Sequence, residues 1–233
     1  MTSTTPVEHI IWDWNGTLLA DSAASIDATI EAFAAAGIPF ITRALYQRHN
    51  TRPIPLFYDR LARRSLSARE HEQLSQHYLA SYSRRLETAP LNQGAADALA
   101  RWRAAGGRQS LLSMHPHDSL VRHVVQHGIA DFFNLVDGTH GSPAGCKAPL
   151  LTHHLARLDV RPDNVAVVGD SVDDARAAHE SGVRCVLYHA SELAGHAREH
   201  LEELGVPVVD SLEAAVTCVA GAGRSTRTSG WSR

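Results

Sequence analysis

The sequence predicts an α/β protein with a doubly wound parallel sheet, of Rossmann-like type, and an inserted all-helical cap domain. Five short apolar runs rich in β-branched residues recur along the chain, separated by segments with helical periodicity. This alternation is typical of a parallel sheet covered by helices. Between about residue 20 and residue 90 such runs are missing and helical patterns dominate. A chain of 233 residues has room for this core and one smaller insertion.

The expected strands are, in chain order, HIIW, SLLS, VAVVGD, RCVLYH and VPVV. Ser22 is expected to cap the first inserted helix, which carries Ile26, Ile30 and Phe33 at spacings of four and three and ends at Gly37. The segments AADALARWRAAGG and DSLVRHVVQHG also end on glycine and are predicted as helices. A proline-containing break at TRPIP divides the helical insertion.

These elements give a domain organisation. We expect residues 1–20 and 90–219 to form the core and residues 21–89 to form the cap. Residues 220–233 are small, polar and aperiodic, so a frayed tail is expected there.

The composition excludes several classes of protein. A formal net charge of -3 gives no positive field for nucleic-acid binding. The three cysteines form no CxxC pair, which argues against a disulfide framework or a cysteine zinc site and fits a reducing cytoplasm. No basic region followed by an apolar segment and no stretch of about 18 apolar residues is present, so neither secretion nor membrane insertion is expected.

Polar residues follow or precede several expected strands, where ligands of open α/β sheets bind. Asp13 follows the first strand, Ser113 the second and Asp170 the third, and Lys147 lies in the loop region before that third strand. Two carboxylates at one edge repel each other unless a cation lies between them, and oxygen ligands suit magnesium.

These residues fall into four motifs: DWNGT (residues 13–17), SLLSMH with Ser113, GCKAPLL with Lys147, and GDSVDD (residues 169–174). In this order and placement they resemble the motifs of the haloacid dehalogenase superfamily of hydrolases. The resemblance covers about residues 7 to 215. The helical insertion after the first motif resembles the first type of cap in that family, as in phosphoglycolate phosphatase and its relatives.

The resemblance implies a magnesium-dependent phosphatase that acts on a small phosphorylated metabolite, phosphoglycolate or a similar compound, through an aspartyl-phosphate. The catalytic residues would be Asp13, Asn15, Ser113 and Lys147. The metal would be held by Asp13, the backbone carbonyl of Asn15 and Asp170, with Asp174 anchoring its water shell or Lys147. The residues implied in substrate binding are Gly16, Thr17, Ser113, Met114 and Lys147, and we add Arg52 from its place at the TRPIP break.

One residue departs from the family pattern. Asn15 stands where phosphatases of the family have a second aspartate, which protonates the leaving alcohol and then activates water. An amide does neither, and general acid–base help is worth about 10² to 10⁴ in rate, or roughly 3 to 5 kcal/mol. The backbone carbonyl at this position is unaffected by the change.

Three explanations stay open. His115 could move protons instead, the substrate could carry a good leaving group, or the domain could bind a phosphorylated ligand, or regulate a partner, with little turnover. If the missing acid limits the reaction, Asn15→Asp is expected to raise turnover on simple phosphate esters.

Other features have a plainer interpretation beside a functional one. Seven arginines lie between Ile38 and Arg69, which fits a solvated helix face as well as a surface that steers anions. Arg52 is the one expected to reach a carboxylate or second phosphate of the substrate. The string HAREH (residues 196–200) matches a zinc-protease motif but is short and lies after the fourth strand. The pair in HPH (residues 115–117) lacks a third ligand, and Trp12, Trp14 and Trp102 are expected to be packing residues.

Overall fold

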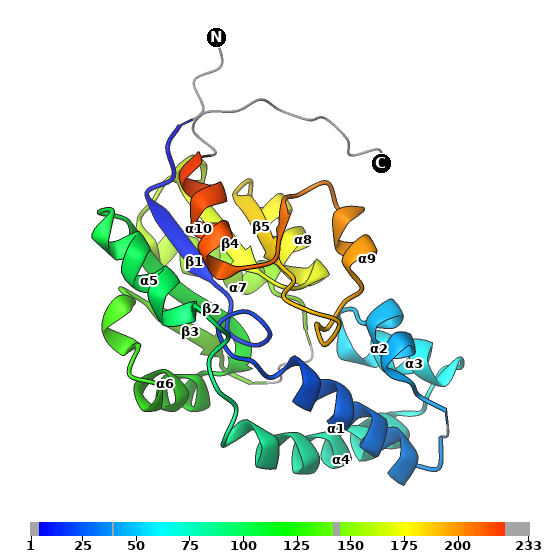
Figure 1. The fold of residues 1–233 in the computed structure, drawn as a ribbon. Helices are drawn as coiled ribbons and strands as arrows, with labels where there is room; N and C mark the ends of the chain where they lie inside the picture. Colours follow the sequence, from blue (N-terminus) through cyan, green and yellow to red (C-terminus); the bar gives the residue numbers. More distant parts are fainter. Residues whose placement is uncertain (1–4, 39, 142–144, 222–233) are drawn as a thin grey trace.

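A computed structural model describes residues 5–38, 40–141 and 145–221 of the chain. Within these ranges six parallel strands form one sheet in the order β3-β2-β1-β4-β5-β6, which confirms the predicted fold class. Figure 1 shows helices on both faces of the sheet and a separate group of helices beside it. The strands are β1 (His9–Trp12), β2 (Arg108–Pro116), β3 (Val136–Thr139), β4 (Val165–Gly169), β5 (Arg184–Tyr188) and β6 (Val208–Val209).

The helices account for most of the remaining described residues. They are α1 (Ser22–Ala35), α2 (Arg43–His49), α3 (Ile54–Ala62), α4 (Ala68–Leu86), α5 (Ala95–Ala104), α6 (His117–Gln126), α7 (Ala148–Leu158), α8 (Val172–Glu180), α9 (Arg198–Glu202) and α10 (Leu212–Gly221), with short 3₁₀ turns η1 (Ala130–Phe132) and η2 (Pro162–Asn164).

Strand β1 lies at the centre of the sheet because both of its edges are paired. Ile10 is opposite Gln109 of β2 and Ala166 of β4. A strand covered on both faces is buried along its whole length, which explains the apolar run of Ile10, Ile11 and Trp12, while the buried His9 is satisfied by a hydrogen bond to Ser110. Strands β2 and β3 follow β1 on one side of it, and β4, β5 and β6 follow on its other side, so the strand order reverses between β1 and β4. Ligands of such sheets bind beyond the strand ends at this switch point.

Two apolar cores fill the space between the sheet and its helices. On one face the buried side chains of α5, α6 and α10 pack against Ile10 and Trp12. On the other face α7, α8 and α9 pack against Ile11. Trp12, Trp14 and Trp102 all belong to the first core, so they are packing residues as predicted.

The insertion between β1 and β2 consists of α1 to α4, which Figure 1 shows grouped together. These helices have an apolar core of their own, built around residues such as Phe33, Phe57 and Leu74. In contrast, Tyr82 and Leu86 near the end of α4 pack into the first core of the sheet. The insertion thus has its own interior and a base shared with the sheet, whereas the predicted limits at residues 20 and 90 stay predictions.

The start of α1 differs from the prediction by one residue. Ser22 is the first helical residue, and Asp21 occupies the N-cap position without a side-chain bond to the helix. The expectation that Ser22 caps this helix is therefore wrong, and the Asp21 carboxylate is engaged elsewhere. The helix ends as predicted, because Gly37 follows it with a φ of +71°.

Strand β3 was not predicted, because Asp137 and Gly138 interrupt its apolar pattern. The Asp137 carboxylate is 8% exposed and lies 2.6 Å from Nδ1 of His154. His154 Nε2 in turn lies 2.8 Å from the Ser110 hydroxyl, which also meets Nε2 of His9 at 2.8 Å. A polar chain across three strands thus satisfies the buried carboxylate, and the sequence pattern alone does not reveal such a partner.

The last helix extends beyond the predicted core. Helix α10 continues to Gly221, two residues past position 219, and the rest of the predicted tail lies outside the described residues. In the part of the chain that the structure describes, no helix has both the length and the apolar character that crossing a bilayer requires.

Candidate active site

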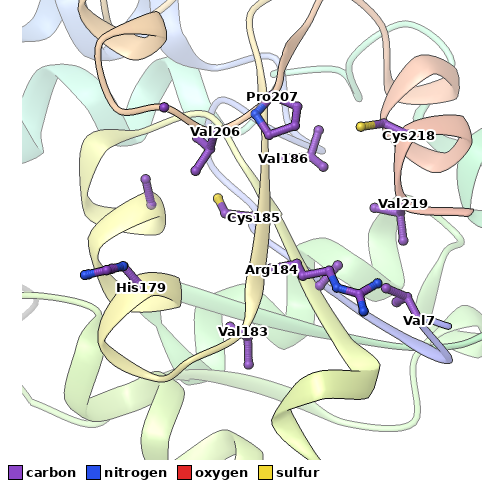
Figure 2. Close-up of a pocket in the computed structure, with 13 residues that line it drawn as sticks. Val7, His179, Val183, Arg184, Cys185, Val186, Val206, Pro207, Cys218 and Val219 are labelled. Carbon is purple, nitrogen blue, oxygen red and sulfur yellow. The ribbon is translucent and has the colours of Figure 1, made fainter. Parts of the chain in front are cut away.

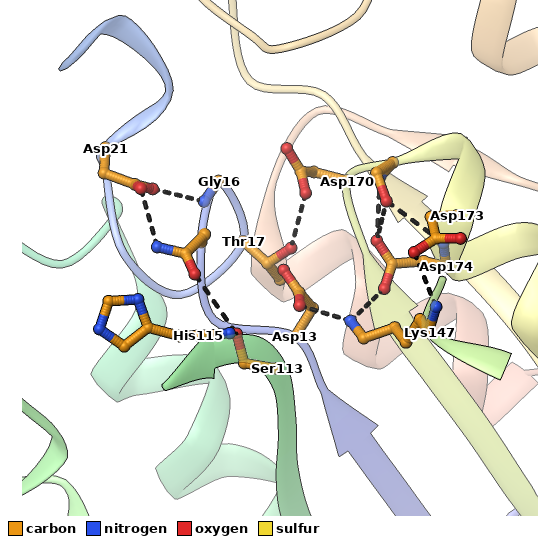
Figure 3. A network of polar contacts seen from close by, with 12 residues as sticks. Asp13, Gly16, Thr17, Asp21, Ser113, His115, Lys147, Asp170, Asp173 and Asp174 are labelled. Carbon is orange, nitrogen blue, oxygen red and sulfur yellow. Dashed lines mark hydrogen bonds and ion pairs between the residues drawn. The ribbon is translucent and has the colours of Figure 1, made fainter. Parts of the chain in front are cut away.

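The carboxyl ends of the central strands bring three of the predicted acids together. Asp13 follows β1, Asp170 follows β4, and Asp174 lies in the first turn of α8. One carboxylate oxygen from each residue lies within 4.8 Å of the others. Figure 3 shows these side chains converging with Lys147 on one small volume. Segments that are more than 150 residues apart in sequence thus form a single site.

Lys147 supplies the positive charge of this cluster. It immediately precedes α7 and is 4% exposed. Its ammonium lies 2.5 Å from Oδ1 of Asp13 and also contacts Oδ1 of Asp174. If all three carboxylates are ionised, as they would be around a bound cation, the one ammonium leaves two negative charges in excess. The donor set and this excess charge fit a divalent cation with a preference for oxygen ligands.

Burial and charge shift the pKa values of these groups in different directions. Burial raises the pKa of Asp13 to about 7, although Lys147 opposes the shift. Burial and the neighbouring carboxylates raise the pKa of Asp170. Burial also acts on Asp174, but there the Lys147 ammonium outweighs it and lowers the pKa. Although burial opposes it, contact with Asp13 and Asp174 raises the pKa of Lys147, so the ammonium stays charged at neutral pH.

Hydrogen bonds hold the two acids in the first turn of α8. Asp174 accepts from the backbone N–H and the hydroxyl of Ser171, which together make a capping box at the start of α8. Asp173 accepts from the backbone N–H of Lys147 at 2.9 Å. A Cβ on Gly169 would lie 2.3 Å from Cγ of Asp174, so the glycine leaves the space that this carboxylate occupies.

Gly16 makes the turn after Asp13 possible and also leaves space for a neighbouring carboxylate. The sequence predicts that this glycine lets the backbone approach a phosphate, and this stays a prediction. In the structure it has a φ of +76°, and a Cβ here would lie 2.1 Å from Oδ2 of Asp170. The glycine thus makes room for the Asp170 carboxylate, which also accepts from the Thr17 hydroxyl at 3.5 Å.

Both the nitrogen and the oxygen of the Asn15 side chain form hydrogen bonds. Its Nδ2 donates to Oδ2 of Asp21 at 2.8 Å and to the hydroxyl of Tyr82 at 2.9 Å, and its Oδ1 accepts from Ser113 at 3.3 Å. Asp21, which is 1% exposed, also accepts from the backbone N–H of Gly16 at 2.7 Å and from Tyr82. Burial raises the pKa of the Asp21 carboxyl.

Sequence reasoning missed Asp21. A short polar residue directly before a helix is expected to cap it, and that expectation hides any other role. One feature of the sequence could have pointed to Asp21. It is an acid that lies shortly after the DWNGT motif, in which asparagine replaces the usual second aspartate.

Ser113, Met114 and His115 lie inside β2 and not in a loop after it. Pairing with β3 is irregular between Leu112 and Pro116, and such irregularities redirect side chains near active sites. The carbonyl of Met114 accepts from the hydroxyl of Thr139. The Ser113 hydroxyl reaches the site and accepts from the His115 backbone N–H.

The His115 ring lies on the side of Ser113 away from Asp13, as Figure 3 shows. Burial lowers its pKa to about 4, so it holds no extra proton at neutral pH. Its ring packs near that of His123, with centroids 5.4 Å apart. This placement does not favour His115 as a substitute for the missing acid.

Arg52 differs from the other cap arginines. It is half-buried, and its positive charge offsets part of the rise that burial produces in the pKa of Asp173. Its charge therefore acts on an acid at the start of α8. Most of the others are exposed, and Arg43 and Arg64 pair with acids of the insertion, as expected for a solvated surface.

Helix α2 is tied to the loop after β5 by side chains that bind main-chain oxygens. Gln47 donates to the carbonyls of Glu192 and Ala194 at 2.9 Å each, and Asn50 donates to the carbonyl of Gly195 at 3.0 Å. A Cβ on Gly195 would lie 3.9 Å from Oδ2 of Asp170, so this junction borders the acids. We call these three bonds the α2 latch.

The two histidine motifs do not form metal sites. Helix α9 starts at Arg198, so His196 lies outside it, and Nε2 of His196 contacts Asn50. Among the described residues, no group of three metal-ligand side chains includes His196. In HPH the two rings diverge, because His117 packs against His140 and not beside His115.

Two cavities lie at the opposite, amino ends of the strands. One of about 280 Å³ is lined by mostly apolar side chains, with Cys185 of β5 and Cys218 of α10 on its wall (Figure 2). The other, about 200 Å³, lies beside His9 and Arg108. Neither includes Asp13, so neither is part of the candidate site.

The family follows from this geometry and from comparison with known proteins. A family model of haloacid dehalogenase-like hydrolases matches residues 7–182. The chain therefore belongs to the haloacid dehalogenase-like hydrolases, and the resemblance predicted from the four motifs is confirmed.

Individual relatives refine this placement. The phosphoglycolate phosphatase of Rhodobacter capsulatus is 25% identical over 196 residues, which cover 77% of this chain and 83% of the relative. A predicted phosphatase from Clostridium acetobutylicum has a TM-score of 0.76 and 14% identity, over 92% of this chain and 99% of its own. A predicted phosphoglycolate phosphatase from Haemophilus somnus gives 0.71 and 16%, over 91% and 98%. Such low identity to solved structures supports the fold alone.

Proposed function

We propose that the protein is a magnesium-dependent phosphatase that hydrolyses a small phosphorylated metabolite through an aspartyl-phosphate on Asp13. The observation that carries this proposal is the buried cluster of Asp13, Asp170 and Asp174 within 4.8 Å, with the Lys147 ammonium between two of them. Carboxylates act as nucleophiles in phosphoryl transfer, and the Lys147 ammonium favours the ionised form of Asp13 by opposing the effect of burial on its pKa.

The chain offers a ligand set for the ion. We propose that Asp13, Asp170 and the backbone carbonyl of Asn15 hold it, with Asp174 anchoring its water shell or Lys147. When bound, magnesium would polarise a phosphoryl oxygen and offset negative charge.

The side chains around Asp13 have distinct roles in this proposal. The Asp13 carboxylate attacks phosphorus while Lys147 offsets the charge of the nucleophile and of the transferring group. The Ser113 hydroxyl, which in this structure donates to Asn15, would turn to the phosphate oxygens, which the backbone N–H of Met114 would also bind. The N–H of Gly16 is not available for this, because it donates to Asp21. Arg52 would bind a carboxylate or second phosphate of the substrate, in keeping with the effect of its charge on Asp173.

A second candidate is a domain that binds a phosphorylated ligand, or regulates a partner, with little turnover. The amide at Asn15 favours it, because this position lacks an acid. For either function we propose a cytoplasmic protein that does not bind nucleic acid, in line with the net charge of -3.

Phosphate release with magnesium separates the two candidates. A malachite-green screen of phosphorylated metabolites, phosphoglycolate included, is run beside an Asp13→Asn control. Release above the control is expected for at least one compound. Release no greater than the control for every compound, together with calorimetric binding of one of them, supports the binding domain.

A further inference from the structure

Both amide hydrogens of Asn15 are engaged inside the protein. An asparagine amide has two N–H donors, and here they go to Asp21 and to Tyr82. Tyr82 and Gly16 also donate to Asp21, so both carboxylate oxygens act as acceptors, which fixes the nitrogen of Asn15 on their side. The oxygen of Asn15 accepts the hydrogen of the Ser113 hydroxyl.

The amide cannot easily turn away from these partners. Asp21 is 1% exposed and Tyr82 is 7% exposed, so water does not replace a broken bond at low cost. Asp21 is thus a positioning residue that acts through Asn15, and it connects the turn after β1 with α4 of the cap.

We infer that position 15 offers the leaving group neither a proton nor a hydrogen bond, and that the site acts on phosphoryl donors whose leaving group departs as a stable anion. Acyl phosphates and phosphoanhydrides are this class of substrate. The inference rests on the proposed phosphatase function and narrows it. An alkyl ester such as phosphoglycolate is expected to be turned over poorly.

The chemical step balances without an acid. A carboxylate oxygen of Asp13 forms a bond to phosphorus, the bond from phosphorus to the leaving oxygen breaks, and the leaving group keeps the bonding pair and departs as a carboxylate or phosphate anion. In the second step water attacks phosphorus and its proton passes to the released phosphate or to solvent. The bond to Asp13 breaks and its carboxylate is restored.

Neighbouring groups do not supply the missing proton. The Asp21 carboxyl is turned to Asn15, Gly16 and Tyr82, which all donate to its oxygens. The Tyr46 hydroxyl lies 3.2 Å from that of Ser25, and burial raises its pKa to about 12, which makes it a weak acid. The Ser113 and Thr17 hydroxyls donate to Asn15 and Asp170. The His115 ring lies beyond Ser113 and has a lowered pKa.

The dependence of rate on leaving-group acidity tests this inference. We would measure kcat/KM with magnesium for acetyl phosphate and for aryl phosphates of similar size that carry none, one or two nitro groups. Wild type is expected to cleave acetyl phosphate and to show a steep rise in kcat/KM as the phenol becomes more acidic.

A double variant exchanges the side chains of residues 15 and 21. Asn15→Asp with Asp21→Asn places a carboxyl at position 15 and an amide at position 21 to hold it. It is expected to gain about 10²-fold in kcat/KM on phenyl phosphate, and its kcat/KM should depend less steeply on the acidity of the phenol. Asn15→Asp alone brings two carboxylates to about the 2.8 Å now spanned by the amide bond, so a smaller gain is expected. Circular dichroism and calorimetry of magnesium binding check that each variant is intact.

The outcomes are distinct. If the kcat/KM of wild type does not change with the acidity of the phenol, or if wild type cleaves phenyl phosphate rapidly, the inference is wrong but the proposed phosphatase function is not affected. An exchanged variant that folds and binds magnesium but gains nothing on phenyl phosphate also overturns it. No release from acetyl phosphate or any ester above Asp13→Asn overturns the proposed function itself.

Discussion

Replacing Gly16 by alanine should damage the site far more than the fold. At a φ of +76° an alanine is strained by about 1 to 2 kcal/mol. In addition, the new Cβ would lie 2.1 Å from Oδ2 of Asp170, whereas contacts under 3.0 Å essentially never occur. The Asp170 carboxylate must therefore move by roughly 1 Å. A misplacement of this size costs about 10² in rate, and magnesium affinity should fall as well.

Gly37 provides the matched control. Its φ is +71° and nothing lies within 4 Å of a Cβ built there, so Gly37→Ala has the strain without the collision. Urea unfolding should show a similar loss of stability for both variants. Calorimetry with magnesium and phosphate release should show a loss for Gly16→Ala alone. Equal magnesium affinity and turnover in the two variants would refute the role assigned to Gly16.

Three further predictions concern charge, the cap and pH. Lys147→Gln leaves Asp13 and Asp174 without their ammonium, so urea unfolding in EDTA should show a loss of about 3 kcal/mol, and unchanged stability would contradict the ion pairs. Gln47→Ala removes two bonds of the α2 latch, so hydrogen exchange of residues 191–196 should quicken about tenfold, and unchanged exchange would mean that the latch does not hold the loop. Burial lowers the pKa of His9 from 6.5 to about 4. As the pH falls, His9 is therefore protonated in the unfolded chain before it is protonated in the folded one. The folded state loses stability between about pH 6.5 and 4. Between pH 8 and 5 the protein should lose about 2 kcal/mol of stability for this reason. The urea midpoint of His9→Gln should therefore depend less on pH than that of wild type. An unchanged pH dependence would show that His9 is not the group responsible.

The sequence predicts those features that repeat a local pattern. β-Branched runs between helical segments indicate the parallel sheet, and the acids at positions 13 and 170 follow such runs directly. Because parallel strands end at a common edge, adjacency in space follows from position in sequence. The cap helices are likewise visible from their periodicity.

What the sequence does not predict depends on contacts between distant residues. Strand β3 contains Asp137, whose burial is possible because His154 and Arg157 of α7 meet its carboxylate. The role of Asp21 depends on Tyr82, 61 residues further along the chain. Similarly, the need for glycine at position 16 arises from Asp170, and a turn pattern does not contain that information.

The anchoring of the cap determines how a substrate can enter. The end of α4 is embedded in the apolar interior of the sheet through Tyr82 and Leu86, whereas the far end, at α2, meets the main body through amide-to-carbonyl bonds. Apolar surface resists separation in water far more than a few exchangeable polar bonds do. The cap should therefore pivot about its base and open on the α2 side, so a ligand would pass along the loop that follows β5 and meet Asp170 before it reaches Asp13.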